Sequence, residues 1–169
     1  MGIIRFIKNK LYNLIKLYRF SLVEKLVTPD GKTLLDIGCQ DISVYNSLKN
    51  SYSITLADFF PSNKLIKKED VQNLSFKNKS FDIVLCQEVL EHVENPVKAI
   101  HELKRITKKQ LIISVPNEPF FTLFRFMVWE KEHLWAIAPS LLKIYLGKPV
   151  YENKIFFHRY YVAVWRFDK

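Results

Sequence analysis

The sequence predicts an α/β fold in which a mostly parallel central sheet carries helices on both faces. Short apolar runs of the buried-strand type alternate with helical stretches along most of the chain, and this alternation is typical of strand–helix–strand units. The chain has 169 residues, of which 49% are hydrophobic and 25% are charged. This size and balance favour one globular domain with a substantial core.

The first 29 residues are expected to form a basic amphipathic helical arm, which precedes the main domain at residues 30–169. Six Lys and Arg side chains but only one acidic side chain, Glu24, fall within residues 1–25. Isoleucine, leucine and tyrosine recur there at helical spacing and form an apolar stripe. Three roles stay open for such a helix: packing on the core, gating of the substrate pocket, and peripheral contact with an anionic membrane surface.

Strand and helix signals alternate after the turn signal at residues 29–31. Strands are expected over residues 33–37, 53–57, 81–86 and 110–115, and helices over residues 42–49 and 95–107. The last two strands are expected within residues 156–167, with a turn near His158 and Arg159 that makes this hairpin antiparallel. The expected architecture is therefore a Rossmann-like three-layer sandwich with an antiparallel C-terminal hairpin.

The few glycines and cysteines exclude several classes of protein. The four glycines are too far apart to build a G-x-G-x-x-G or Walker phosphate loop, which excludes P-loop NTPases and typical nucleotide dehydrogenases. Two cysteines without C-x-x-C spacing predict neither a disulfide framework nor a metal site, and they favour a reducing, cytoplasmic location. No apolar run reaches the roughly 18–20 residues that a membrane-spanning helix needs.

Two carboxylates stand at the ends of predicted strands. Ligands of doubly wound sheets bind beyond the carboxyl ends of the strands, so polar residues at these ends are candidate site residues. Asp36 is the penultimate residue of a buried strand, and its carboxylate needs a ligand amine or backbone amides to offset the cost of burial. Asp58 follows another strand, where it can either accept hydrogen bonds from a ribose diol or cap a turn before Pro61.

Five segments carry a resemblance to a known family. They are LLDIGC (34–39), AD (57–58), EDVQNLSF (69–76), SFDIVLCQEVLEHV (80–93) and IISVPN (112–117). In this order they strongly resemble the class I S-adenosylmethionine-dependent methyltransferases, within the small-molecule group related to the quinone methyltransferases. The segment over residues 80–93 is the most specific of the five.

The resemblance implies a set of residues on the methionyl side of S-adenosylmethionine. Asp36 would hold the methionyl ammonium through water or backbone, and Gly38 would leave room for the backbone to approach the cofactor. Cys86 and Gln87 would line the methionyl side from the end of a neighbouring strand.

The resemblance also implies residues on the nucleoside side. Asp58 would bind the ribose hydroxyls, and Phe59 would lie against the adenine ring. Asp70 would accept a hydrogen bond from the exocyclic amine of adenine, and the Val71 backbone amide would meet a ring nitrogen.

The loop after the first strand departs from the family pattern. Cys39 and Gln40 are expected to contact the cofactor, but Gln40 and Ile42 stand where the family commonly has further glycines. A positive φ at Gln40 would be strained by about 1 kcal/mol or more, and Asp41 is the expected N-cap of the next helix. The chain is therefore expected to be a working methyltransferase or a degenerate member that serves as a non-catalytic binding or partner subunit.

The implied reaction is an in-line displacement of the sulfonium methyl group by an oxygen, nitrogen or carbon of a small-molecule acceptor. Among the four histidines, His133 is the candidate general base because it lies beside Glu132 and Trp135 in the substrate-side region. His92 is expected to be structural, and His101 is expected to lie at the surface.

Aromatic residues are concentrated in the last third of the chain, where 14 of the 24 aromatic side chains follow residue 119. This segment either forms an apolar lid for a lipid-linked or quinone-like acceptor or packs the outer helix and the final hairpin. A sugar is a further expected acceptor, and a second chain in a homo- or hetero-oligomer is a further expected partner. Nucleic acid is not expected as a partner.

Overall fold

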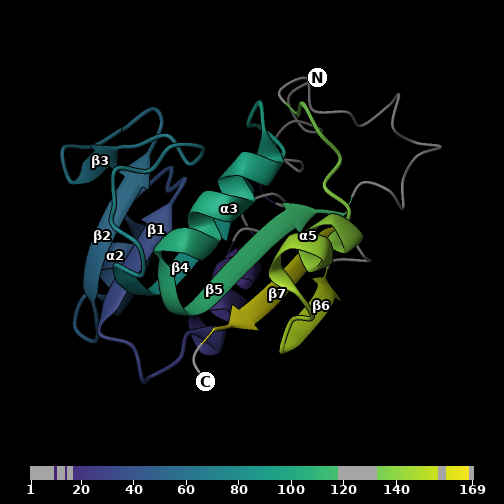
Figure 1. Cartoon of the computed structure of the whole chain (residues 1–169). Helices are drawn as coiled ribbons and strands as arrows, with labels where there is room; N and C mark the ends of the chain where they lie inside the picture. Colours follow the sequence, from purple (N-terminus) through teal and green to yellow (C-terminus); the bar gives the residue numbers. More distant parts are fainter. Residues whose placement is uncertain (1–9, 11–13, 15–16, 118–132, 156–158, 168–169) are drawn as a thin grey trace, which may run out of the picture.

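The computed structural model of the chain describes residues 10, 14, 17–117, 133–155 and 159–167. Within these residues seven strands form one sheet in the order β3-β2-β1-β4-β5-β7-β6 (Figure 1). The strands are β1 (Thr33–Ile37), β2 (Ser53–Asp58), β3 (Ile66–Lys68), β4 (Phe81–Gln87), β5 (Thr107–Pro116), β6 (Tyr151–Ile155) and β7 (Tyr160–Arg166). The first five strands pair in parallel, whereas β7 runs antiparallel to both β5 and β6.

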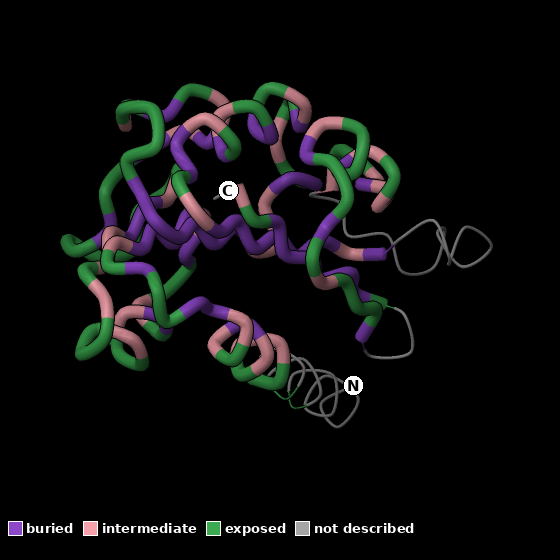
Figure 2. The backbone as a smooth tube through the Cα atoms, turned by 60° about the horizontal axis from the view of Figure 1, so that its bottom comes forward, coloured by how far each residue is buried: buried purple, intermediate pink, exposed green. Residues whose placement is uncertain are grey.

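Helices cover both faces of this sheet, so the molecule has three layers (Figure 2). On one face α3 (Pro96–Ile106) and α5 (Pro139–Leu146) share a core that contains Leu103 and Leu142. On the other face the helix over residues 17–26 and α2 (Ser43–Leu48) bury Val23 and Val44. The predicted three-layer α/β fold is confirmed.

The central strands are unbroken apolar runs because both of their faces are covered. Along β4, Ile83 and Leu85 pack into the core beneath the N-terminal helix, whereas Val84 and Cys86 pack beneath α3 and α5. This alternation follows from the two-residue period of a strand. It explains why the apolar runs of the sequence located β1, β2, β4 and β5 with small errors in their bounds.

The N-terminal helix packs on the core over the residues that the structure describes. Val23 and Val27 are 1% and 8% exposed, while Leu17 and Tyr18, earlier in the same helix, are 64% and 53% exposed. Core packing is therefore confirmed for the second half of the predicted arm. Most of its first half lies outside the described residues.

Local signals explain where α3 begins and how it is held. The Asn95 side chain accepts a hydrogen bond from the Lys98 amide at 2.9 Å, and Pro96 occupies the first turn, where its missing N–H is not needed. In the last turn Arg105 donates to Glu102 and to the carbonyls of Phe76 and Leu74. These bonds tie α3 to the loop that precedes β4.

Two strands differ from the sequence-based expectation. The final hairpin was expected within residues 156–167, but β6 lies earlier, at Tyr151–Ile155. Its residues are mostly exposed and only Ile155 is buried, so an edge strand of this kind gives no apolar run. The short strand β3 escaped prediction for the same reason, because Lys67 and Lys68 are exposed.

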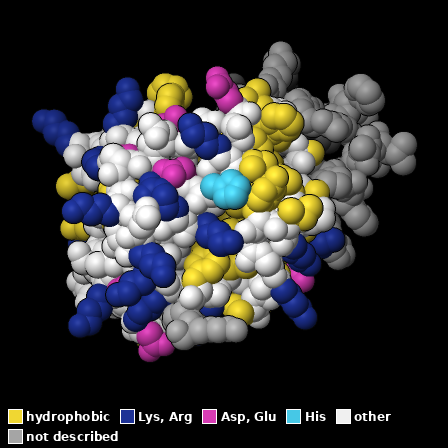
Figure 3. All heavy atoms as spheres, viewed as in Figure 1, with side chains coloured by type: hydrophobic (Ala, Val, Ile, Leu, Met, Phe, Trp, Pro, Cys, Tyr) yellow, Lys and Arg dark blue, Asp and Glu magenta, His cyan; other side chains and the backbone are white. Residues whose placement is uncertain are grey.

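The net charge of the chain is +9, and basic side chains are spread over the face that Figure 3 shows. Apolar side chains are also visible on the same face. Over the described residues, the exposed large hydrophobic side chains include Ile144 of α5 and Val150, at 73% and 62%. None of the helices in the described part of the chain combines the length and the apolar content that crossing a membrane would require.

Candidate functional site

The carboxyl end of β1 places Asp36 in the middle of the sheet. Asp36 is 4% exposed and lies between Leu56 of β2 and Leu85 of β4. Burial, together with the nearby carboxylates of Asp41 and Asp58, raises the pKa of Asp36 to about 7. A cation that binds beside such a buried carboxyl group stabilises its ionised form.

Gly38 allows the chain to turn sharply after β1. Its φ is +81°, and a Cβ atom at this position would lie 2.1 Å from Cγ2 of Val89. The amides of Gly38 and Cys39 both donate to the Ala57 carbonyl, at 2.8 and 3.3 Å. The β1 loop is therefore packed tightly between β2 and the turn that follows β4.

Gln40 does not adopt the positive φ that would strain it. Among the described residues other than glycine, only Lys79 and Glu88 have a positive φ, so the left-handed step of this loop is confined to Gly38. The Gln40 side chain is exposed, and its carbonyl accepts a hydrogen bond from Ser62 at 3.0 Å. The condition for strain at Gln40 is therefore not met, because the turn is completed one residue after β1.

The cap of α2 differs by one residue from the expectation. The N-cap is Ile42, whose side chain cannot accept a hydrogen bond, and not Asp41. Asp41 nevertheless accepts the Ser43 amide at 2.8 Å, because a side chain of this type can bond to the backbone two residues on. The Asp41 carboxylate thus accepts a hydrogen bond from the first N–H group of α2, although Asp41 lies outside the helix.

Asp58 ends β2 in a turn-capping geometry. One carboxylate oxygen accepts the Phe60 amide at 2.7 Å, which confirms the capping alternative without testing the ribose role. Phe59 is 50% exposed, and its ring meets that of Phe60 edge to face at 4.8 Å. An exposed ring beside this carboxylate is available to stack on a ligand.

Asp70 and Val71 lie in the segment after β3. The Asp70 carboxylate accepts the backbone amide and the side-chain amide of Gln72, at 2.8 and 3.3 Å. Val71 is 5% exposed. The residue before this segment, Glu69, donates its backbone amide to the Asp58 carbonyl. The segment therefore adjoins the end of β2.

The end of β4 completes the group. Cys86 pairs with Ile37 of β1 and is fully buried, and Gln87 is the half-buried last residue of β4. Burial is the largest cause that raises the pKa of Cys86 and the pKa of Cys39. The charge of Asp36 contributes to the shift of Cys86, and the charges of Asp36 and Asp58 contribute to the shift of Cys39. The predicted residues at the ends of β1, β2 and β4 therefore gather at one edge of the sheet.

Comparisons with known proteins agree with this geometry. Residues 35–114 match the family described as "Methyltransferase domain". An uncharacterized protein of Methanocaldococcus jannaschii is 30% identical over 146 residues, 80% of this chain and 64% of that protein. A ubiquinone biosynthesis O-methyltransferase of Coxiella burnetii is 26% identical over 150 residues, 79% of this chain and 64% of the relative.

A solved structure has the same fold over almost the whole chain. A SAM-dependent methyltransferase from Archaeoglobus fulgidus superposes with a TM-score of 0.70 at 15% identity, covering 98% of this chain and 100% of that one. Residues 35–114 thus match a methyltransferase domain, and the chain has the fold of the class I S-adenosylmethionine-dependent methyltransferases. It spans 64% of the length of the two curated relatives named above.

S-adenosylmethionine is the cofactor that the domain match and the fold support, and the residues present fit it. The cofactor carries a positive ammonium and a positive sulfonium, and the charges of Asp41 and Asp58 act on the buried Asp36 at the edge of the sheet where it is expected. Gly38 keeps the backbone of the β1 loop free of a side chain at the sharpest point of the turn. The individual contacts to the cofactor remain predictions.

Glu88 lies in the span, residues 86–88, where sequence reasoning sought the site, but that reasoning gave it no role. It follows β4 with a φ of +54°, a strained backbone conformation for a residue with a side chain. Its carboxylate accepts the Ser114 hydroxyl at 2.8 Å and lies 3.3 Å from the Arg19 guanidinium, with 18% of the side chain exposed. The only signal in the sequence was a charged residue directly after an apolar strand.

Arg19 brings the N-terminal helix to this end of the sheet. Its guanidinium lies 5.4 Å from the centre of the Tyr160 ring as well as against Glu88. Burial raises the pKa of Glu88, while the charge of Arg19 opposes that shift. The helix thus contributes a charged residue to this end of the sheet, and the gating alternative stays a prediction.

The histidines differ in their burial and in the rings that they contact. His133 is half-buried and meets the His92 ring edge to face at 4.7 Å, and its charge is among those that lower the pKa of Glu88. His101 is exposed on α3 against Tyr145, as expected. His158 and the aromatic residues from Phe120 to Trp129 lie outside the described residues.

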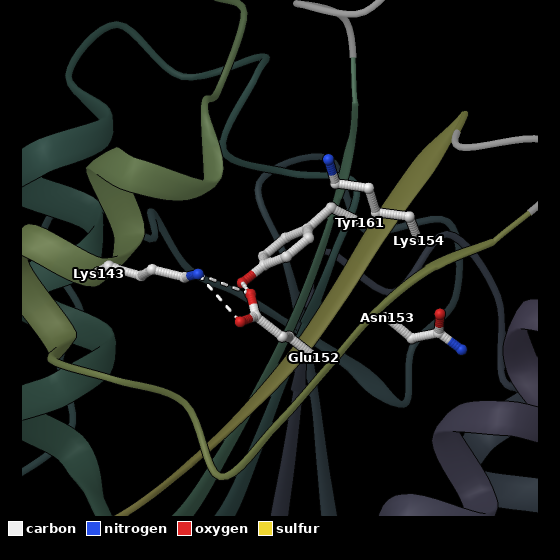
Figure 4. A pocket seen from close by; sticks show the side chains of 5 residues that line it. All are labelled: Lys143, Glu152, Asn153, Lys154 and Tyr161. Atoms are coloured by element: carbon white, nitrogen blue, oxygen red, sulfur yellow. Dashed lines mark hydrogen bonds and ion pairs between the residues drawn. The ribbon is translucent and has the colours of Figure 1, made fainter.

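A separate depression of about 470 Å³ lies between α5 and the final hairpin (Figure 4). Its central groups satisfy one another: Glu152 accepts the Tyr161 hydroxyl at 2.8 Å and pairs with Lys143 at 2.8 Å. Because β4, β5 and β7 separate β6 from β1 in the sheet, this depression is not part of the cofactor site.

Proposed function

We propose that this chain transfers the methyl group of S-adenosylmethionine to a hydroxyl oxygen of a small, apolar, quinone-like acceptor. The observation that carries the proposal is the acidic cluster of Asp36, Asp41 and Asp58 at the ends of β1 and β2, which suits a cationic cofactor. The name of the Coxiella relative, an O-methyltransferase of ubiquinone biosynthesis, supports oxygen as the acceptor atom.

The chain's own residues have distinct tasks in this proposal. Asp36 holds the methionyl ammonium, Asp58 accepts the ribose hydroxyls, and Gly38 permits close backbone approach. The cofactor, when bound, supplies a methyl group made electrophilic by the sulfonium. The protein then contributes alignment of the acceptor and exclusion of water.

Glu88 is the residue best placed to manage the proton of the acceptor hydroxyl. Its carboxylate stands just beyond β4 and is held by Ser114 and Arg19. Because burial raises its pKa, the Glu88 carboxylate is more basic than an exposed one and closer to the operating range of a general base. His133, the candidate from the sequence, lies on the same side and remains the alternative base.

Calorimetric titration of the purified, ligand-stripped chain with S-adenosylmethionine and S-adenosylhomocysteine tests the cofactor site. We expect one site with a dissociation constant of about 1–100 μM, corresponding to about −8 to −5.5 kcal/mol. Absence of binding to a folded chain would contradict the proposal and favour the alternative of a non-catalytic partner subunit.

Transfer of a labelled methyl group then tests the acceptor class. We expect product with short-chain quinols and catechols and none with a matched panel of amines. Glu88→Gln should lower the rate about 100-fold or more while S-adenosylhomocysteine affinity is retained, because a general base contributes roughly 10²–10⁴-fold. Product with amines alone would overturn the assignment to oxygen.

A further inference from the structure

The strand β6 forms one edge of the sheet. Among the described residues β6 pairs with β7 and with no other strand, so its outer side presents backbone N–H and C=O groups that face away from the sheet. The three central residues of the strand, Glu152, Asn153 and Lys154, are exposed. An edge of this kind accepts a further strand in antiparallel pairing. We propose that two copies of this chain associate through β6, about a two-fold axis at Asn153.

The order of the side chains along β6 is self-complementary. In this arrangement Glu152 of each copy faces Lys154 of the other copy, and Tyr151 faces Ile155. The charged pairs lie on one face and the apolar pairs on the other, because successive side chains of a strand alternate. Figure 4 shows this alternation: Glu152 and Lys154 extend to the side of α5, whereas Asn153 points away from it.

Charge also selects one register of this pairing. A slip of two residues keeps the same faces but brings Glu152 opposite Glu152 or Lys154 opposite Lys154. Like charges that face each other directly across two strands are destabilising. A slip of one residue turns the side chains of one copy to the other face. Of these registers, the one about Asn153 is therefore the one that pairs opposite charges.

The opposite edge of the sheet shows that charges on an edge strand can have the reverse effect. Lysines on an edge strand usually prevent pairing with another chain. The strand β3 fits that role, because an antiparallel second copy about its central residue would bring Lys67 opposite Lys67. In β6 the position that faces each lysine holds an acid, so the charges of this edge favour a second copy.

The surroundings of β6 leave the proposed contacts available. Glu152 pairs with Lys143 at 2.8 Å and accepts the Tyr161 hydroxyl at 2.8 Å, but 41% of its side chain is exposed and a carboxylate has room for further donors. Val150, directly before β6, is 62% exposed and adds apolar surface beside the edge. Because β7, β5 and β4 lie between β6 and β1, the interface is separate from the acidic cluster of the cofactor site.

Sedimentation equilibrium of the full chain measures the association. We expect a dimer with a dissociation constant of about 10 μM or tighter. Lys154→Glu brings acid opposite acid and should weaken the dimer by about tenfold or more. Lys68→Glu makes the same change of charge at an exposed position of β3 and is the matched control, which should leave the dimer intact.

Mixing two variants distinguishes loss of this contact from loss of the fold. Glu152→Lys places lysine opposite lysine, so this variant and Lys154→Glu should each be mainly monomeric alone. An equimolar mixture of the two should associate again, because both acids of one copy then face lysines of the other. Circular dichroism of each variant shows that it is folded before the mixture is measured.

Cross-linking tests the register. The axis places the two copies of Asn153 opposite each other, at the Cα separation of about 4.5–5.5 Å of an antiparallel pair, which a disulfide can span. Asn153→Cys should therefore form a disulfide-linked dimer under a mild oxidant. Lys154→Cys, whose two copies lie two positions out of register, should form much less. The native Cys39 and Cys86 are buried and do not compete.

Any one of three results would overturn the proposal. The first is a wild-type chain that stays monomeric at about 100 μM, well above the expected dissociation constant. The second is a Lys154→Glu variant that dimerises as the wild type does, because the interface would then lie elsewhere. The third is a mixture of the two charge variants that fails to associate together with an Asn153→Cys variant that fails to cross-link.

Discussion

At the scale of single residues, the Asp36 carboxyl favours binding of a cation at the expense of stability. Its pKa of about 7 in the folded, ligand-free chain exceeds the 3.8 of an ordinary Asp. Between these values the folded state binds the additional proton, so stability falls as pH rises through this window and stays low above it. Asp36→Asn should therefore raise the melting temperature of the ligand-free protein at pH 8, by about 2–4 °C per kcal/mol regained.

The gain should be smaller at pH 5, where Asp36 is already protonated in the folded state. Thermal denaturation at both pH values, with the exposed Asp30→Asn as control, measures the difference. Equal shifts at the two pH values would contradict the assignment of the raised pKa to Asp36.

Asp58 also belongs to this scale, because its turn-capping and ligand roles can be separated. Asp58→Ala should weaken S-adenosylhomocysteine binding by about 1–3 kcal/mol, through loss of hydrogen bonds to the ribose. Asn63→Ala is a matched control: the Asn63 side chain accepts the Leu65 amide at 2.9 Å, in the same kind of turn as Asp58 and Phe60. If calorimetry shows that both variants lose the same amount of S-adenosylhomocysteine affinity, Asp58 caps a turn and does not bind the ribose.

At the scale of elements, the β1 loop is packed against the turn after β4 through Gly38. Gly38→Ala places a Cβ atom at a strained, positive φ and in overlap with Val89. Gly147→Ala places a Cβ atom at a similarly positive φ, but no atom lies within 4 Å of it. Gly147→Ala should cost about 1 kcal/mol, and Gly38→Ala should cost more. Urea denaturation measures both, and Gly38→Ala/Val89→Ala should recover part of the excess; equal costs for the two glycines would disprove the packing argument.

Elements also show what the sequence can predict and what it cannot. β1 and β4 were found because burial on both faces makes them apolar throughout, and α3 was found because Asn95-Pro96 marks its start. β6 was placed too late because an edge strand exposes most of its side chains. Local patterns thus identify elements that are buried or capped, and they fail for elements whose pairing depends on a distant strand.

At the scale of the whole molecule, a chain with net charge +9 contains a local acidic cluster. Asp36 and Asp58 could be predicted as site residues because each ends a strand, and parallel strands bring such ends to one edge. The contacts of Glu88 with Arg19 and of His133 with His92 could not be predicted, because they join segments distant in sequence. The sheet topology therefore explains why Asp36 and Asp58 could be predicted. The contacts of Glu88 and His133 depend on how the N-terminal helix and residues 133–135 pack, which local sequence patterns do not show.

The same cluster makes cofactor binding by the whole protein dependent on pH. A bound ammonium favours ionised Asp36, so binding below pH 7 must expel a proton, and affinity should fall by up to about tenfold per pH unit as pH decreases. Calorimetry with S-adenosylhomocysteine from pH 5.5 to 8.5, in buffers of different ionisation enthalpy, measures both the affinity and the proton released. Asp36→Asn should bind more weakly at pH 8 and lose the dependence below pH 7. A wild-type affinity that stays constant from pH 8 to pH 5.5 would show that the ammonium is held by groups other than Asp36.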